Sequence, residues 1–403
     1  MKAVVFTLGC KVNEVESASI MAELDKRGWE TCDGLSYADI YVLNTCAVTK
    51  EAERKSRQLI ARALKFNPNA RVYVCGCASE KDKGQFERPN VRFIGGAKDK
   101  EKVVGAIASD FGGGECAALG YPKSVKTRAF IKIEDGCNNF CSYCVIPYLR
   151  GRVKSRSIGD ITGEIACCTA PEIVLTGINI SAYDGCEEGL TGLIKALSFT
   201  DKRVRLGSLE CNVITEEFLT ALKGLNDFAP QFHLSLQSGS NAVLRAMNRH
   251  YTREEYLEKC ALIYDYFPNG AVTTDIIAGF CGETEEDFSD SLTIIEEAGF
   301  ARVHAFAFSP REGTRAYGMP DVPKDIKSGR LHRLLNAGKT AGQKFINKQL
   351  GREYAVIFED FDGEYTCGYT GNYVKVYVKG EHTGKVTVRL LQPLRDGVSA
   401  EII

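Results

Sequence analysis

The sequence predicts an α/β protein in three parts: a doubly wound parallel sheet, a partial barrel of six strand–helix units, and a small antiparallel β-barrel. Three observations support this division. Short apolar segments alternate with helical periodicity up to about residue 118, and the same alternation begins again near residue 124. From residue 347 onward the chain is instead β-rich, with glycine turns between the segments. The predicted domains are therefore 1–118, 124–345 and 347–403.

The elements follow from the periodicity of the apolar residues. In the first part, Thr49 is a suitable N-cap for its helix, and a glycine-rich segment at 111–115 leads into a linker through Tyr121 and Ser124. In the second part, six strand–helix units fall short of the eight that close a barrel. The predicted strands are 3–8, 39–43, 71–74, 91–94, then 129–134, 172–176, 203–209, 231–236, 271–277, 302–308, then 354–358, 373–378 and 385–390; the predicted helices include 14–29, 49–66 and 324–350.

Composition narrows the class of protein. The 403 residues are 44% hydrophobic and 26% charged, and no apolar run approaches the roughly 20 residues of a membrane helix. The N-terminal segment resembles a first strand more than a signal peptide, and sixteen cysteines without such a signal indicate reduced thiols and metal ligation. We therefore expect a cytoplasmic enzyme without a membrane partner. A net charge of −1 means that any nucleic acid must be held by local patches.

Cys137, Cys141 and Cys144 (the loop cysteines) form a C-x₃-C-x₂-C motif directly after a predicted strand. Three thiolates at this spacing can hold three irons of a cubane [4Fe–4S] cluster and leave the fourth iron open to a substrate. The alternative is a structural zinc knuckle, for which the sequence offers no fourth Cys or His at finger spacing. The motif therefore predicts a catalytic iron–sulfur site.

Cys10, Cys46 and Cys77 (the sheet cysteines) each follow a predicted strand of the first part. The carboxyl ends of parallel strands share one edge of a sheet, so the three thiols should converge there and could hold a second cluster. The alternative is that each is a small apolar packing residue, and Cys75 is the main rival to Cys77 as the third ligand. Gly9 and Gly76 would let the backbone approach the cluster closely.

Nearly the whole chain resembles the radical S-adenosylmethionine methylthiotransferases. The sequence around Cys10 and Cys46 looks most like the branch that acts on N6-threonylcarbamoyladenosine in tRNA. Two departures from the family pattern are Cys281, where the family usually has Pro, and residues 78–80. The segments that carry the resemblance are Thr-Leu-Gly-Cys-Lys-Val-Asn at 7–13, Asn-Thr-Cys-Ala-Val-Thr at 44–49, the loop-cysteine motif, His-Leu-Ser-Leu-Gln-Ser-Gly-Ser at 233–240, Met-Asn-Arg-His-Tyr at 247–251, Thr-Asp-Ile-Ile-Ala-Gly-Phe-Cys-Gly-Glu-Thr at 274–284 and Phe-Ser-Pro-Arg-Glu-Gly-Thr at 308–314.

The resemblance implies two [4Fe–4S] clusters and S-adenosylmethionine as cofactors. The cluster on the loop cysteines would generate an adenosyl radical that abstracts hydrogen from C2 of the adenine, and the cluster on the sheet cysteines would deliver a methylated sulfur. An aromatic C–H offers no acidic proton, so the cofactors must supply the chemistry. Cosubstrate contacts are expected at the strand ends and beside the loop, where each residue could equally be a cap or packing residue: Thr176, Gly177, Ser208, Glu210, Gln237, Ser238, Arg249, Asp275 and Tyr143.

RNA contacts are expected at Arg150, Arg152, Lys154 and Arg156, which follow the loop cysteines. A second patch lies on the helix after Cys46, at Arg54, Lys55 and Arg57. The C-terminal part resembles a TRAM domain, and its interleaved cations and tyrosines suit phosphates and stacked bases: Lys375, Lys379, Lys385, Arg389, Tyr369, Tyr373 and Tyr377. The alternatives are an ordinary solvated face and an ordinary barrel core.

The function expected from these features is methylthiolation of an adenosine beside the anticodon of tRNA, with a flavodoxin or ferredoxin as electron donor and no DNA partner. One alternative is the same chemistry on isopentenyladenosine or on a ribosomal-protein side chain. A different class would be an iron–sulfur or zinc RNA-binding protein without catalysis.

Overall fold

The computed structural model describes residues 1–112, 116, 119 and 127–403. The predicted linker through Tyr121 and Ser124 lies outside the described residues. The chain divides into two compact units. The first comprises Met1–Lys123, Asp135–Val153 and Arg311–Thr314, and the second comprises Ser124–Glu134, Lys154–Pro310 and Arg315–Ile403. The loop cysteines therefore belong to the same compact unit as the sheet cysteines.

The first unit is built on a five-stranded parallel sheet in the order β2-β1-β3-β4-β5. This is a doubly wound order, as predicted, with its switch point between β1 and β3. The elements are β1 (Lys2–Thr7), α1 (Lys11–Lys26), β2 (Glu30–Cys32), β3 (Ile40–Thr45), α2 (Lys50–Leu64), β4 (Arg71–Gly76), α3 (Cys77–Lys81), β5 (Val91–Ile94), α4 (Lys100–Asp110) and α5 (Ile146–Arg150).

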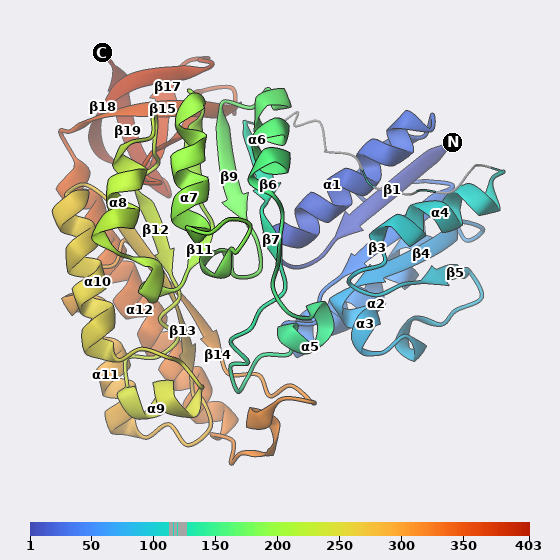
Figure 1. The fold of residues 1–403 in the computed structure, drawn as a ribbon, viewed down its shortest axis with the longest axis horizontal. Helices are drawn as coiled ribbons and strands as arrows, with labels where there is room; N and C mark the ends of the chain where they lie inside the picture. The colour runs from blue at the N-terminus through green and yellow to red at the C-terminus, as the bar shows by residue number, and fades with distance from the viewer. Residues whose placement is uncertain (113–115, 117–118, 120–126) are drawn as a thin grey trace. The chain divides into compact units, whose positions relative to one another are not determined.

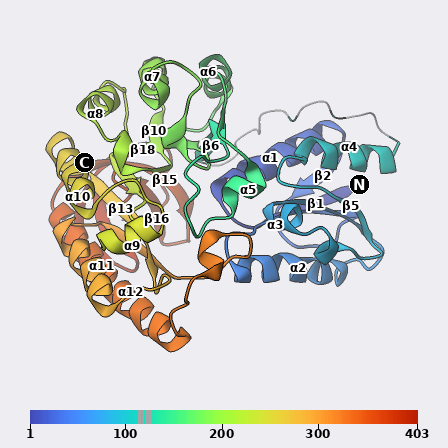
Figure 2. The same ribbon diagram turned by 60° about the horizontal axis from the view of Figure 1, so that its bottom comes forward.

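Helices cover both faces of this sheet (Figure 2). One face packs α1 and α4 against the strands, through side chains such as Leu24 and Val104. The other face packs α2, through Leu59 and Ile60, together with α5. Thr49 caps α2 by accepting a hydrogen bond from the backbone N–H of Ala52 at 3.1 Å, as its sequence position predicts. The strand β2 and helix α4 were not among the predicted elements.

The second unit begins with seven parallel strands in two sheets, β10-β9-β6 and β11-β12-β13-β14, with helices outside them (Figure 1). The six predicted strand positions are all present. The elements are β6 (Arg128–Lys132), α6 (Ile158–Cys167), β9 (Glu172–Thr176), α7 (Gly189–Ala196), β10 (Arg203–Leu206), β11 (Ser208–Leu209), α8 (Glu216–Lys223), β12 (Gln231–Leu234), α9 (Asn241–Ala246), α10 (Arg253–Tyr266), β13 (Ala271–Ala278), α11 (Glu285–Glu297), β14 (Arg302–Ala307) and α12 (Lys324–Gln349), with two-residue strands β7 (Glu134–Asp135) and β8 (Lys154–Ser155) on either side of the cysteine loop in sequence.

The predicted single strand at 203–209 is two strands that meet at Gly207. The segment before Gly207 pairs with β9, and the segment after it pairs with β12. The Gly207 N–H donates to the Leu175 carbonyl at 2.8 Å, and a Cβ at residue 207 would lie 2.9 Å from that oxygen. The chain can pass from one sheet to the next here because glycine leaves room for this contact.

The C-terminal part is a closed barrel in the order β15-β16-β17-β19-β18 around a core that includes Val356, Val376 and Leu390. Its strands are β15 (Glu353–Phe361), β16 (Tyr365–Thr370), β17 (Lys375–Lys379), β18 (Lys385–Leu394) and β19 (Gly397–Ile402). This confirms the predicted small β-barrel, although β16 and β19 were missed. No helix among the described residues has the length and apolar character needed to span a membrane.

The C-terminal barrel docks against the first residues of the central strands. At the start of β10, Arg203 donates to the carbonyl oxygens of Ala355 (3.0 Å) and Tyr369 (3.3 Å). At the start of β9, Glu172 is buried and accepts from Arg128 and Arg205. These strand ends are opposite to the carboxyl ends at which a parallel barrel carries its chemistry.

Candidate functional site

The sheet cysteines lie at the carboxyl ends of three neighbouring strands. Cys10 follows β1 and stands directly before α1, Cys46 follows β3, and Cys77 begins α3 directly after β4. Burial raises the pKa of the Cys46 thiol to about 11, and the neighbouring Cys77 and Cys10 thiols add to that shift. The structure thus brings the three thiols together at one edge of the sheet. Cys46 and Cys77 are buried, whereas Cys10 is exposed, so the site is open on the Cys10 side.

Two glycines allow these strand ends to approach one another. Gly9 has a φ of +113°, and a Cβ there would lie 2.9 Å from the Cβ and 3.0 Å from the Sγ of Cys46. Gly76 has a φ of +110°, and a Cβ there would lie 2.4 Å from the Thr45 carbonyl oxygen. A larger residue at either position would push these strand ends apart.

A single amide side chain joins the ends of β1 and β3. The Nδ2 group of Asn13 donates to the carbonyl oxygens of Leu8 at 2.7 Å and of Thr45 at 3.1 Å. Its Oδ1 atom accepts from Arg150 at 2.6 Å and faces the Cys10 thiol at 3.9 Å. Asn13 therefore fixes the positions from which Cys10 and Cys46 project.

Two buried cations stand beside the thiols. The Nε group of Arg150 donates to the Cys77 Sγ atom at 3.3 Å, and Lys100 contacts the Cys75 Sγ atom at 3.6 Å. Both cations pair with Glu16, Arg150 at 2.9 Å and Lys100 at 3.3 Å. Burial opposes the charge of Arg150, but Glu16, the Cys77 thiol and Asp135 raise its pKa above the ordinary value, so it remains a cation.

Cys75 and Cys77 belong to opposite faces of the sheet. Cys75 is fully buried and packs with the α1 and α4 side of the core, whereas Cys77 packs with the α2 and α5 side. The thiol that interacts with Cys46 and with Cys10 is that of Cys77. The choice of Cys77 as the third ligand stays a prediction, and this geometry supports it.

The loop cysteines are partly exposed and lie in a tightly folded segment of the same unit. The Cys137 N–H donates to the Gly151 carbonyl at 3.1 Å, and the Asn139 N–H lies 3.5 Å from the Cys137 Sγ atom. Gly136 has a φ of +87°, and a Cβ there would lie 2.2 Å from the Arg152 carbonyl oxygen. Phe140 adopts a positive φ of 47°, which is unusual for a residue with a side chain. The backbone is thus tightly turned on both sides of Cys137.

The donor sets fit iron–sulfur clusters. The described residues contain no group of three or more His, Cys, Asp or Glu side chains arranged around a single metal ion. A cubane does not need one, because its thiolates bind different irons. The sheet cysteines offer three converging thiols as iron ligands. The glycine backbone beside them leaves room for a cluster, and the guanidinium on Cys77 balances the negative charge that a cluster carries.

Apart from Tyr143, which belongs to the first unit, the expected cosubstrate residues lie in the second unit, and their roles stay predictions. Thr176 is buried at the end of β9, and a Cβ at Gly177 would lie 2.2 Å from the Glu134 carboxylate, which sequence reasoning had not singled out. Arg249 donates to the Glu210 carboxylate, so two of the expected residues hold each other. Of the remaining expected residues, Ser208 is exposed, Gln237 has a φ of 71° and pairs with the β13 backbone, Ser238 is buried against Ser291, Asp275 lies 3.3 Å from His233, and Tyr143 is half-buried.

The expected RNA contacts divide into two groups. For Arg150, the expectation of a surface phosphate contact is wrong, because the residue is 2% exposed and its guanidinium is held by Glu16 and Asp135. Arg156 is half-buried and pairs with Glu164 at 2.5 Å. Arg152 and Lys154 are exposed, and Arg152 lies over the Phe140 ring at 4.4 Å.

Two tyrosines of the C-terminal barrel are also engaged within the protein. Tyr369 and Tyr373 stack on each other at 4.9 Å, and Arg128 lies 4.8 Å from the Tyr369 ring. Arg205 lies 4.7 Å from the Tyr373 ring. These rings help to dock the barrel, although Tyr373 is 39% exposed, and their expected contacts with stacked bases stay a prediction.

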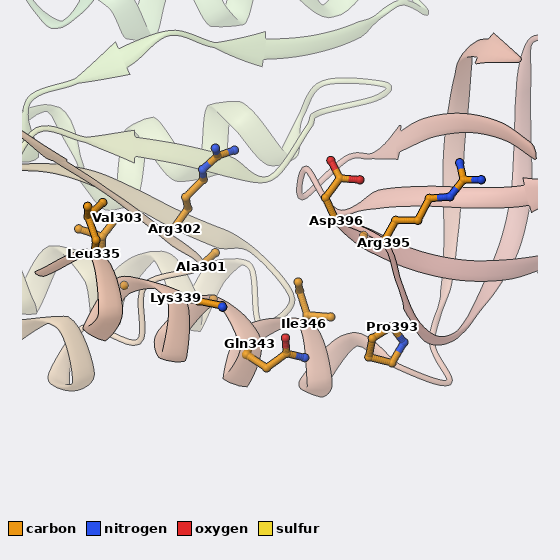
Figure 3. Close-up of a pocket in the computed structure, with 13 residues that line it drawn as sticks. Ala301, Arg302, Val303, Leu335, Lys339, Gln343, Ile346, Pro393, Arg395 and Asp396 are labelled. Atoms are coloured by element: carbon orange, nitrogen blue, oxygen red, sulfur yellow. The ribbon is translucent and has the colours of Figure 1, made fainter. Parts of the chain in front are cut away.

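A separate surface pocket of about 360 Å³ lies between α12, the start of β14 and the β18–β19 turn (Figure 3). It combines the cations Arg302, Lys339 and Arg395 with Asp396. It adjoins the N-terminal end of β14, away from the carboxyl ends that carry the expected cosubstrate residues. It contains none of the predicted site residues.

Sequence reasoning missed the polar residues that support the sheet cysteines. Asn13, Glu16 and Ser17 are buried in the first turns of α1, ahead of the apolar Ile20 and Leu24 on the same helix. Polar residues on the inward face of a helix beside a cysteine are the signal that could have found them. Lys100 begins α4 far along the sequence, and only the fold brings it to Cys75.

Comparisons with known proteins agree with this architecture. Residues 2–95 match the family described as uncharacterized protein family UPF0004, and residues 131–295 match the radical SAM superfamily. The chain is 37% identical to the threonylcarbamoyladenosine tRNA methylthiotransferase MtaB of Chlamydia pneumoniae, over 98% of this chain and 97% of that protein. It is 33% identical to a tRNA-2-methylthio-N(6)-dimethylallyladenosine synthase of Aliarcobacter butzleri, over 100% of this chain and 99% of that protein.

Among solved structures, the fold is similar to the radical S-adenosylmethionine methyltransferase TsrM of Kitasatospora setae. The TM-score is 0.59 at 12% sequence identity, covering 78% of this chain and 77% of that chain. At this identity the likeness concerns the fold alone.

Proposed function

This chain belongs to the radical S-adenosylmethionine methylthiotransferase family, in its MtaB-like branch, and from that premise we propose that it adds a methylthio group to C2 of N6-threonylcarbamoyladenosine beside the anticodon of tRNA. The observation that carries the proposal is the convergence of three strand-end thiols, with a buried guanidinium on one of them, in the same compact unit as the C-x₃-C-x₂-C loop. One set of thiols would serve cosubstrate cleavage and the other sulfur transfer.

In this proposal the residues have separate tasks. The loop cysteines and the sheet cysteines each hold a [4Fe–4S] cluster, and S-adenosylmethionine is the cosubstrate. When bound, these cofactors supply one-electron cleavage of the cosubstrate and a transferable sulfur. The protein's own residues orient the donors: Gly9 and Asn13 set the positions of the thiols of Cys10 and Cys46. The exposed Cys10 side is where the base would approach, since Cys46 and Cys77 are buried.

Several finer points stay predictions. The electron donor is expected to be a flavodoxin or ferredoxin, the anticodon loop is the expected RNA element, and a cytoplasmic location is expected for an enzyme with reduced cysteines. DNA is not an expected partner. Arg152 and Lys154 remain the candidate phosphate contacts near the loop cysteines, because both are exposed.

The test is nucleoside mass spectrometry on tRNA from a strain that lacks the gene. We expect loss of 2-methylthio-N6-threonylcarbamoyladenosine, restored by the wild-type chain but not by a Cys10→Ala or Cys141→Ala variant. Loss of the methylthio group from isopentenyladenosine instead would move the chain to the branch of the Aliarcobacter relative. Unchanged tRNA with a missing mark on a ribosomal protein would refute a tRNA substrate.

A further inference from the structure

We propose that Arg150 is a positioning residue for the cysteine site on the sheet: its Nε–H group bonds the Cys77 thiolate and holds that ligand in place when the site carries a cluster. The inference rests on the proposed function in one respect, namely that the sheet cysteines bind a [4Fe–4S] cluster. It assigns a role to a residue that belongs in sequence to the loop cysteines, six positions after Cys144.

The contacts of Arg150 exceed what pairing a buried charge would require. Its Nη1 group meets Glu16 at 2.9 Å and Asp135 at 3.0 Å, and its Nη2 group meets Asn13 at 2.6 Å. These bonds leave the Nε–H group aimed at the Cys77 Sγ atom, 3.3 Å away. A guanidinium has five N–H donors in a rigid fork, so fixing its outer nitrogens also fixes the direction of Nε–H.

A thiolate that binds iron is a hydrogen-bond acceptor, and bonds to cluster sulfurs are one of the means by which proteins set cluster potentials. A donor at Cys77 stabilises negative charge on that sulfur. Because the reduced cluster carries one more negative charge than the oxidised one, the bond should favour reduction. Arg150 should therefore raise the midpoint potential of this cluster and slow the loss of its iron.

Arg150 also ties the two cysteine sets together. The next residue, Gly151, accepts the hydrogen bond from the Cys137 N–H at 3.1 Å. The side chain of residue 150 thus contacts a sheet cysteine while the adjoining backbone holds the first loop cysteine. This arrangement explains why a cation at this position is buried rather than presented to RNA.

Lys100 provides a matched control. It is a second buried cation, 4% exposed, and it pairs with the same Glu16 at 3.3 Å. However, its Nζ atom contacts the Sγ atom of Cys75, at 3.6 Å, and not that of Cys77. Removing Lys100 therefore deletes a positive charge from the same network without deleting a bond to a sheet cysteine.

The experiment uses the full chain with the three loop cysteines changed to alanine, so that only the sheet cysteines can load a cluster. The backbone N–H of residue 137 remains, and with it the bond to Gly151. After anaerobic reconstitution, the parent should bind about four irons per chain. The variants Arg150→Met, Arg150→Lys and Lys100→Met are then compared by redox titration and by the rate of iron loss to a chelator.

We expect Arg150→Met to shift the midpoint to a more negative potential and to speed iron loss about 10–100-fold, the usual cost of removing a hydrogen-bond partner of a metal ligand. Lys100→Met should shift both quantities less, and Arg150→Lys should restore part of the potential because it keeps a cation. Equal shifts in Arg150→Met and Lys100→Met would mean that only buried charge matters and would overturn the proposal. An unchanged midpoint potential together with an unchanged rate of iron loss in Arg150→Met would overturn the proposal as well.

Arg150→Met leaves two carboxylates without their guanidinium, so it could fold poorly. A double variant that also carries Asp135→Asn removes that charge imbalance, because Glu16 still pairs with Lys100, and it must show the same negative shift. A parental midpoint potential in a folded double variant would contradict the role of Arg150. A parent that binds no iron would refute both this inference and the proposed second cluster. The expected cluster behaviour, together with a wild-type chain that leaves tRNA unmodified, would refute the proposed function alone.

Discussion

Asn13 and Thr45 are joined across the end of the first sheet: the Asn13 side-chain amide donates to the Thr45 carbonyl at 3.1 Å. The same amide holds Leu8 at 2.7 Å, so one side chain spans the ends of β1 and β3 immediately before Cys10 and Cys46. The spacing of two thiols thus depends on a residue that binds no metal. This relationship leads to the first prediction.

Asn13→Ala should lower the free energy of unfolding by about 1–3 kcal/mol, because two carbonyls, one of them buried, lose their donor. It should also reduce the iron content at the sheet cysteines. Asn67→Ala is the control, since Asn67 donates to the buried Ala38 carbonyl at 2.8 Å in the same unit. The control should lose stability but keep its iron. Urea unfolding and iron analysis measure the two quantities, and equal iron loss in both variants would refute a specific role for Asn13.

Cys77→Ala should lower the iron content of the reconstituted enzyme to about half, since one of two clusters loses a ligand. Cys75→Ala should leave the iron content unchanged, because Cys75 is fully buried on the α1 and α4 side of the sheet. Colorimetric iron and sulfide analysis distinguishes the two. The reverse result would make Cys75 the third ligand.

Glu172→Ala should destabilise the protein by about 3–5 kcal/mol, because it leaves buried arginines without their shared carboxylate. Arg205 and Arg128 bond this carboxylate at 2.8 Å and 2.7 Å, and Arg128 also pairs with Glu359 of the C-terminal barrel at 2.6 Å. Glu353→Ala removes an exposed ion pair with Arg389 and should cost about 1 kcal/mol or less. Thermal unfolding of both variants tests this, and similar melting temperatures would refute the difference.

The same carboxylate predicts a pH dependence. Burial alone would raise the pKa of Glu172, but Arg205, Arg128 and Arg203 lower it below its ordinary value. A carboxyl group with a lowered folded pKa contributes stability that is fully present above the unfolded pKa of about 4.3 and is lost as pH falls below it. The difference in the free energy of unfolding between the wild type and Glu172→Gln, measured at a series of pH values, should shrink as the pH falls below that point. A difference that is constant with pH would contradict the assignment.

Lys154→Ala should weaken tRNA binding and lower the slope of log affinity against log salt by about 0.7–0.9, the effect of one lost phosphate contact. Lys154 is exposed and follows the loop cysteines in sequence. Lys195→Ala is the control, because Lys195 is exposed but pairs with Glu188 and Glu217. Fluorescence titration at several salt concentrations measures both slopes. An unchanged slope for Lys154→Ala would exclude a phosphate contact.

Much of the fold was predictable because periodicity is a local signal. The strands around Val42 and Val74, the cap at Thr49 and the six central strand positions all follow from apolar spacing along short segments. The break at Gly207 was not predictable, because it depends on which neighbour each half of the strand bonds. The strands β16 and β19 were also missed, because apolar and polar residues alternate only weakly in them. They pair with their neighbours when the barrel closes.

Sequence alone determined the two cysteine sets, the order of the three parts and the family that they indicate, since motif spacing and strand-end positions are properties of the chain itself. Only the tertiary structure decided that Cys77 and Cys75 pack on opposite faces of the sheet, and that Arg150 is buried on a thiol rather than exposed to RNA. The physical reason is that burial and charge pairing are set by residues distant in sequence. Glu16 and Lys100 reach the site only after the sheet has formed.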